Sequence, residues 1–202
     1  MIEFFFDCSS PWTYLAFHNI IPLAREFDCD IQWRPILVGG VFNTINPSVY
    51  QSRDKPIPAK GSYAKKDLAD WARVAGLKII RPSIFPINSV KAMRGCIYLA
   101  PRGKLVEFAR AVFEAYWGDD RDIASDEVLA NLCRKVGADP KELLAGISEQ
   151  TVKDQLRKNT DELIARGGFG SPTIYLDHDD MYFGNDRLPL VRAALERHKG
   201  SR

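Results

Sequence analysis

The sequence predicts an α/β fold in which a long helical segment interrupts a strand-containing domain. An apolar run at Ile2 to Phe6, a helical period over Pro11 to Phe27 and a second apolar run at Ile31 to Val38 predict a strand–helix–strand unit. Its long crossover favours parallel pairing of the two strands. Strand signals return only after Gly170. The predicted order is therefore βαβ, then helices, then ββα.

The segment between the two strand-containing parts is predicted to be helical after an initial loop. Residues 43–61 are rich in Asn, Ser, Pro and Lys, which favours a long loop. Capping residues and glycines divide the remainder into helices. Their boundaries are a stop at Gly76, a start at Asn88 or Ser89, a stop near Gly118, a start at Ser125, a stop at Gly137, a start at Asp139–Pro140 and a stop at Gly167–Gly168.

Two short strands and a helix close the chain. Thr173 to Leu176 and Met181 to Phe183 flank the turn-forming residues Asp177 to Asp180, which predicts a β-hairpin. A terminal helix is expected over Leu188 to His198.

The element order also predicts two domains. Residues 1–42 and 168–202 would form one discontinuous domain, and residues 43–167 an inserted α-helical domain. The 202 residues, 46% hydrophobic and 27% charged, suffice for a sizeable core and exclude a disordered or collagen-like chain.

The cysteine pattern and the N-terminus predict a cytoplasmic protein. The four cysteines form no C-x-x-C pair, which indicates a reduced compartment rather than a disulfide framework. The first residues lack the basic and apolar regions of a signal peptide, and no uncharged apolar run approaches membrane-spanning length. The three histidines are scattered, so no metal site is expected.

The small net charge of +2 conceals a strong asymmetry. Residues 1–52 carry 2 basic and 5 acidic groups, and residues 105–202 carry 14 and 18. Residues 53–104 carry 12 basic and 3 acidic groups, a net charge of +9. This segment predicts an anionic partner, which could be a small molecule or, as a second class of function, a nucleic acid.

Three short motifs lie at expected junctions between elements. Ser10-Pro11 at the start of the first helix is a common capping pair, although a helix N-terminus can also hold an anion. Ser171-Pro172 precedes a strand, where a trans proline is the default interpretation. Gly184 to Arg187 precedes the last helix, with Asn185 or Asp186 as its N-cap.

Together these motifs in the order βαβ…ββα resemble the thioredoxin fold. Ser10-Pro11-Trp12-Thr13 resembles its Cys-Pro-Trp-Cys redox motif with both cysteines replaced, and the helical insertion resembles the DsbA-like branch. Within that branch the chain is similar to 2-hydroxychromene-2-carboxylate isomerases and kappa-class glutathione transferases. The similar segments are 6–16, Arg34–Leu37, Phe85–Ser89, Ala115–Gly118, Gly168–Thr173 and Gly184–Leu188.

The resemblance implies glutathione as cofactor and assigns residues to it. Ser10 would be catalytic, donating a hydrogen bond to the glutathione sulfur and favouring the thiolate together with the helix N-terminus. Ser171 and a cis Pro172 would contact the cysteinyl part. Asn185 and Asp186 would bind the γ-glutamyl end.

Further residues are assigned by the same resemblance. Asn46 and Lys60 match positions that contact glutathione in kappa-class relatives. Without the resemblance, Lys60 would be interpreted as a solvated lysine of a loop. Asn88 and Lys91 are candidates for the substrate carboxylate or carbonyl, with helix capping as the competing role of Asn88. The implied substrate is a small anionic aromatic compound, and a homodimer is expected.

The implied reaction is cis–trans isomerisation of an unsaturated aromatic keto acid by reversible thiolate addition. A kappa-class-like transferase or peroxidase is the alternative. A DsbA-like oxidoreductase is disfavoured because both motif cysteines are replaced, and a nucleic-acid-binding module because no known motif is present. Cys8 departs from the family pattern, and is either an inert apolar side chain or a site of mixed disulfide formation with glutathione.

Overall fold

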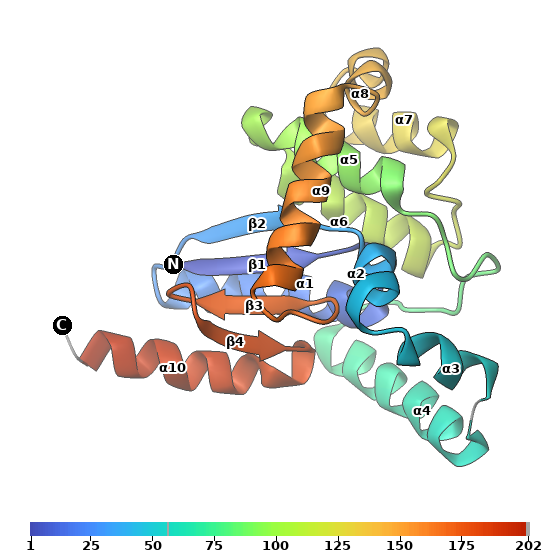
Figure 1. The fold of residues 1–202 in the computed structure, drawn as a ribbon. Helices are drawn as coiled ribbons and strands as arrows, with labels where there is room; N and C mark the ends of the chain where they lie inside the picture. Colours follow the sequence, from blue (N-terminus) through green and yellow to red (C-terminus); the bar gives the residue numbers. More distant parts are fainter. Residues whose placement is uncertain (56, 201–202) are drawn as a thin grey trace.

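The computed structural model describes residues 1–55 and 57–200, in which four strands form one mixed sheet (Figure 1). The strands are β1 (Ile2–Phe6), β2 (Ile31–Pro35), β3 (Thr173–Leu176) and β4 (Asp180–Phe183). Their spatial order is β2-β1-β3-β4. β1 pairs parallel with β2 and antiparallel with β3, and β4 completes the hairpin. The predicted α/β class, parallel first pair and C-terminal hairpin are confirmed.

Alternate side chains of β1 enter two cores on opposite faces of the sheet. Phe4 and Phe6 belong to the larger core, which α1 (Pro11–Glu26) shares. Phe5 belongs to a smaller core, which α9 (Gln150–Ala165) shares through Leu163. Figure 1 accordingly shows α1 behind the sheet and α9 in front of it. The period-2 geometry of a strand thus accounts for a β1 that is buried on both faces.

The insertion is helical as predicted, but its first part, residues 43–61, is also helical where a loop was expected. It contains α2 (Val38–Ile45), α3 (Ser48–Asp54), α4 (Pro58–Ala75), α5 (Val90–Leu99), α6 (Leu105–Phe113), the π-helical turn Glu114–Gly118, α7 (Asp126–Lys135) and α8 (Pro140–Gly146) before α9. The terminal helix is α10 (Leu188–Gly200).

The prediction of a long loop over residues 43–61 is wrong, because α2, α3 and the start of α4 occupy most of that segment. Local composition reflects turn-forming residues, whereas α2 is stabilised by burying Val41 in the smaller core. Pro58 lies in the first turn of α4, where its missing N–H is not needed. The second strand likewise ends at Pro35 rather than at Val38, which begins α2.

Packing is continuous between the strands and the inserted helices. Phe113 of α6 stacks on Tyr14 of α1 with a centroid distance of 5.1 Å and lies 6.4 Å from the ring of Phe6. The two-domain division of the chain stays a prediction. Among the described residues, no helix combines the length and apolar character needed to cross a bilayer.

Candidate active site

The N-terminus of α1 carries the central group of the site. Ser10 is the N-cap of this helix with extended backbone angles, and its Oγ accepts a hydrogen bond from the Thr13 N–H at 3.3 Å. Pro11 follows in the first turn, as the capping pair predicts. The positive end of the helix dipole therefore lies at the Ser10 hydroxyl.

A hydrogen-bond network joins Ser10 to the loop before β3. The Ser10 hydroxyl donates to the backbone oxygen of Ser171 at 3.4 Å. The buried Ser171 Oγ accepts from the Asp7 N–H at 3.0 Å and lies 2.8 Å from the Thr13 Oγ1. The Ser171–Pro172 peptide bond is cis, as the resemblance implies and contrary to the default interpretation. Ser10 and Ser171 are thus brought together from opposite ends of the chain.

Asp7, which the sequence interpretation did not single out, connects the loops that follow β1 and β2. Its carboxylate accepts from the Ser9 N–H and from the Val38 N–H, each at 2.9 Å. Complete burial raises the pKa of the Asp7 carboxyl, and these hydrogen bonds oppose the rise. The sequence feature that could have identified Asp7 is its position as an acidic residue directly after a buried apolar strand.

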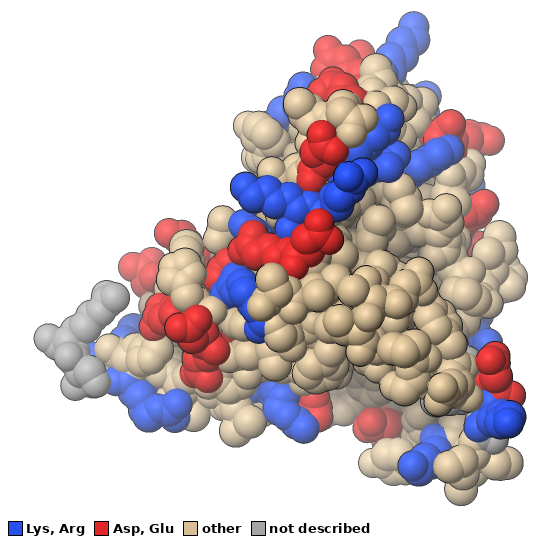
Figure 2. Space-filling model, viewed as in Figure 1, with Lys and Arg blue, Asp and Glu red and all other residues tan. Residues whose placement is uncertain are grey.

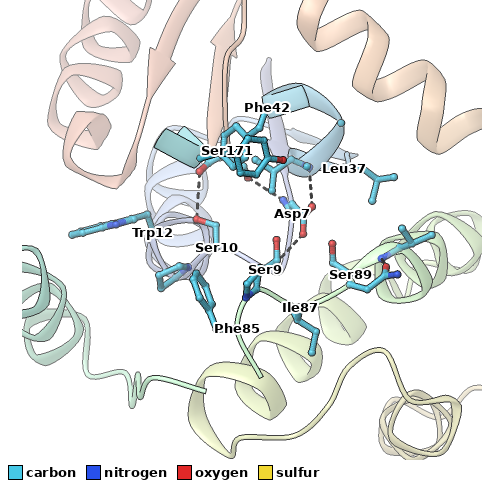
Figure 3. A pocket seen from close by; sticks show the side chains of 18 of the residues that line it. Asp7, Ser9, Ser10, Trp12, Leu37, Phe42, Phe85, Ile87, Ser89 and Ser171 are labelled. Carbon is cyan, nitrogen blue, oxygen red and sulfur yellow. Dashed lines mark hydrogen bonds between the residues drawn. The ribbon is translucent and has the colours of Figure 1, made fainter. Parts of the chain in front are cut away.

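A cavity of about 590 Å³ opens beside Ser10. Figure 3 shows Ser10 and Ser171 adjacent, with Phe42 on one side of the cavity and Phe85 and Ile87 on the other. The cavity is lined by Asp7, Ser9, Ser10, Pro11, Trp12, Leu37, Val38, Gly39, Gly40, Phe42, Tyr50, Phe85, Pro86, Ile87, Asn88, Ser89, Val90, Ser171 and Phe183. Aromatic and aliphatic walls with a few polar groups suit an organic ligand that carries a reactive polar centre.

Cys8 points into the core and does not line this cavity. Its side chain is fully buried, and burial raises the pKa of its thiol well above the ordinary value. Its backbone is held by the Trp117 Nε1–H, which donates to the Cys8 oxygen at 2.9 Å, and by the Met93 Sδ, which accepts from the Cys8 N–H at 3.3 Å. These features favour the interpretation of Cys8 as an inert apolar side chain.

Three of the predicted site residues line the cavity, namely Ser10, Ser171 and Asn88. The Asn88 Oδ1 also accepts from the Val90 N–H at 3.0 Å at the start of α5, whose N-cap is Ser89. A contact of Asn88 with a substrate stays a prediction. Lys91 lies outside the lining, where its Nζ bonds Asp126 at 2.8 Å.

Asn46 and Lys60 also lie outside the described lining of the cavity. The Asn46 Nδ2 donates to the backbone oxygen of Phe169 at 3.2 Å, which ties the end of α2 to the loop before β3. Lys60 is exposed in the first turn of α4.

Asn185 and Asp186 lie next to the cis-proline loop, since the Gly184 N–H donates to the Pro172 oxygen at 3.2 Å. Asn185 is buried, and its Oδ1 accepts from the Asn19 Nδ2 at 2.9 Å while its own Nδ2 has no partner. Asp186 pairs with Arg187 at 2.6 Å. Gly184 holds the N-cap position of the turn here, so the capping role predicted for Asn185 or Asp186 is wrong. Glycine fits because the backbone φ is +103°.

Several cations of the basic segment are paired with acidic residues of this chain. Lys66 and Arg73 both contact Asp70, and Lys78 lies 3.6 Å from Asp119. Asp70 is already counted in the net charge of +9, so among the residues that the structure describes only the pairs with acidic residues outside the segment, Lys78–Asp119 and Lys91–Asp126, offset a small part of it. Within the described part of the chain, no group of three or more His, Cys, Asp or Glu side chains is arranged to hold a metal ion.

The fold and this site define the class of protein. Residues 1–196 match the DSBA-like thioredoxin domain family, so the chain belongs to that family.

Two kinds of enzyme resemble the chain over nearly its whole length. The 2-hydroxychromene-2-carboxylate isomerase of Pseudomonas putida is 28% identical over 197 residues, covering 98% of this chain and 95% of the relative. Glutathione S-transferase kappa 2 of Caenorhabditis elegans is 29% identical over 219 residues, covering 99% and 94%. A solved structure of a 2-hydroxychromene-2-carboxylate isomerase superposes with a TM-score of 0.82 at 27% identity, covering 97% of this chain and 94% of that one.

Proposed function

We propose that this protein is a glutathione-dependent isomerase that interconverts 2-hydroxychromene-2-carboxylate and trans-o-hydroxybenzylidenepyruvate in aromatic catabolism. One observation carries the proposal. The Ser10 hydroxyl lies at the N-terminus of α1 in the wall of a largely apolar cavity that would accommodate an aromatic ring. The similarity to isomerases over nearly the whole chain supports the same reaction class.

The residues around the cavity fit a thiol tripeptide. Ser10 would hold the sulfur, and the backbone next to Pro172, where Ser171 lines the cavity, would hold the cysteinyl unit. The unpartnered Nδ2 of buried Asn185 is a donor that a carboxylate or carbonyl of the γ-glutamyl end would satisfy. Asp186 is exposed nearby and would pair with the ammonium group. Asn46 and Lys60 remain proposed contacts for the other end of the tripeptide.

Ser10 acts on the charge of the sulfur rather than as a nucleophile. An ordinary thiol has a pKa of about 8.5, so only a few per cent is ionised at neutral pH. On binding, the single Ser10 O–H would turn from the Ser171 oxygen to the sulfur, and this donor and the N–H groups of the first helical turn would both favour the anion. When bound, glutathione would supply the thiolate that adds reversibly to the conjugated double bond of the substrate. Asn88 would face the substrate carboxylate or carbonyl from the opposite wall.

A kappa-class-like transferase is the second candidate, favoured by the position of Lys91. Its ion pair with Asp126 holds it outside the cavity lining, so a carboxylate-bearing substrate would not meet this cation there. Electrophiles without a carboxylate would fit the same walls. A dithiol oxidoreductase is disfavoured because Ser10 and Thr13 stand where its cysteines would be, and no residue lining the cavity is a cysteine.

The test compares wild type with Ser10→Ala in an absorbance assay on 2-hydroxychromene-2-carboxylate, with and without glutathione. Ser125→Ala is the matched control, because Ser125 is the N-cap of α7 outside the cavity. We expect activity that requires glutathione, a loss of about 10- to 100-fold in kcat/KM for Ser10→Ala, and a change below about twofold for the control. Activity without glutathione, or an unchanged Ser10→Ala enzyme, would contradict the proposal. Conjugation of a neutral aromatic halide with no isomerisation would establish the transferase instead.

A further inference from the structure

A second hollow lies on the other side of the first turn of α2. It has a volume of about 410 Å³ and is bounded by α2, α5 and α9. Leu37 and Gly40 contribute to both this groove and the catalytic cavity. The groove is therefore a neighbour of the active site but has its own walls.

Arg94 of α5 lines this groove with part of its guanidinium group unsatisfied. The Nε is buried and has no hydrogen-bond partner. Among the residues that the structure describes, no carboxylate lies within ion-pair distance of Arg94. Because buried polar groups nearly always have a partner, this N–H indicates a ligand oxygen or an ordered water at the site.

Two further cations reach the same groove from α9. Lys153 and Arg157 are four residues apart, which places them on one face of the helix, and neither forms an ion pair within the described part of the chain. Like charges at this spacing repel each other, so their pairing does not serve helix stability. Asp161 is the one acidic residue in the lining, which leaves an excess of positive charge. Figure 2 shows Lys and Arg side chains over α9, interspersed with Asp and Glu.

We propose that the groove between α2, α5 and α9 binds a small oxyanion, a carboxylate or a phosphate, with Arg94, Lys153 and Arg157 as its cationic ligands. Guanidinium groups bind both kinds of oxyanion through paired N–H donors, and an ammonium group adds a point charge. The partly buried Arg94 supplies the donor that the protein leaves unpaired, and the partly buried Lys153 and the exposed Arg157 attract the ligand. This site is independent of the reaction proposed for Ser10.

The test titrates the protein with inorganic phosphate and, separately, with succinate, using calorimetry and NMR amide shifts. We expect saturable binding of at least one probe, with shifts confined to the residues of α2, α5 and α9 that line the groove, and unchanged binding in Ser10→Ala. The probe that binds more tightly identifies the oxyanion class.

Three variants distinguish specific binding of the oxyanion in the groove from nonspecific electrostatic attraction to a basic surface. Arg157→Gln and Arg94→Gln should each weaken binding by about tenfold. Lys158→Gln removes the same charge from the adjacent position of α9, outside the groove, and should change binding by less than about twofold. Arg157 is exposed, so its variant is expected to fold even if Arg94→Gln does not. No saturable binding of either probe, or equal weakening by Lys158→Gln, would overturn the proposal.

Discussion

The Ser10 hydroxyl donates to the backbone oxygen of Ser171 at 3.4 Å, although 161 residues separate the two in the chain. This contact joins the first helix to the loop before β3 and lies in the wall of the cavity. It holds the proposed thiol-binding hydroxyl beside the segment proposed to hold the cysteinyl backbone. The geometry of the site therefore depends on the β1–β3 pairing of the sheet.

Removing the Ser171 hydroxyl should destabilise the fold. Ser171→Ala leaves the Asp7 N–H and the Thr13 hydroxyl without their buried partner. We expect the free energy of unfolding to fall by about 1–3 kcal/mol. Urea denaturation measures it, with the exposed Ser148→Ala as control, expected to stay within about 0.5 kcal/mol. A Ser171→Ala protein as stable as the control would show that this network contributes little.

The buried carboxyl of Asp7 should make stability depend on pH in a defined direction. Burial raises its pKa in the folded state, so the folded chain binds this proton more tightly than the unfolded chain does. Ionisation therefore destabilises the fold as pH rises from about 4, the ordinary carboxyl value, until the folded-state pKa is passed.

Asp7→Asn isolates this effect because other titrating groups cancel in the comparison. The free energy of unfolding of wild type minus that of the variant should decrease as pH rises through this window and then level off. Urea denaturation at a series of pH values measures the difference. A difference that is constant, or that increases with pH, would show that the Asp7 pKa is not raised.

Thiol reactivity should follow burial. Cys8 and Cys96 are fully buried, and burial raises the pKa of the Cys8 thiol, whereas Cys29 is partly exposed. We expect an aromatic disulfide reagent to label Cys29 first in the native protein and Cys8 only after unfolding in urea. Peptide mass mapping identifies the labelled sites. Rapid native labelling of Cys8, or its mixed disulfide with glutathione, would reverse the interpretation of this residue as inert.

Features encoded by neighbouring residues could be predicted from the sequence. Ser10-Pro11 and Asp139-Pro140 begin helices as expected, and Gly76 ends α4 with a φ of +67°. The same holds for β1 and β3, whose apolar composition predicts their burial. The resemblance added the cis peptide before Pro172, which local statistics oppose.

Features set by contacts between distant residues could not be predicted. The helices within residues 43–61 depend on burial of α2 against the sheet, which composition does not show. The ion pair of Lys91 with Asp126 joins positions 35 residues apart and removes Lys91 from the cavity lining. The role of Asp7 depends likewise on the Val38 N–H, which only the β1–β2 pairing brings within reach.

The ionisation of bound glutathione tests the central claim most directly. Thiolate ultraviolet absorbance is recorded as a function of pH with glutathione bound to wild type and to Ser10→Thr and Ser10→Ala. The account predicts a thiol pKa well below that of free glutathione in wild type, largely retained in Ser10→Thr and moved back toward the free value in Ser10→Ala. A bound thiol that titrates like free glutathione in wild type, or equally in all three proteins, would contradict it.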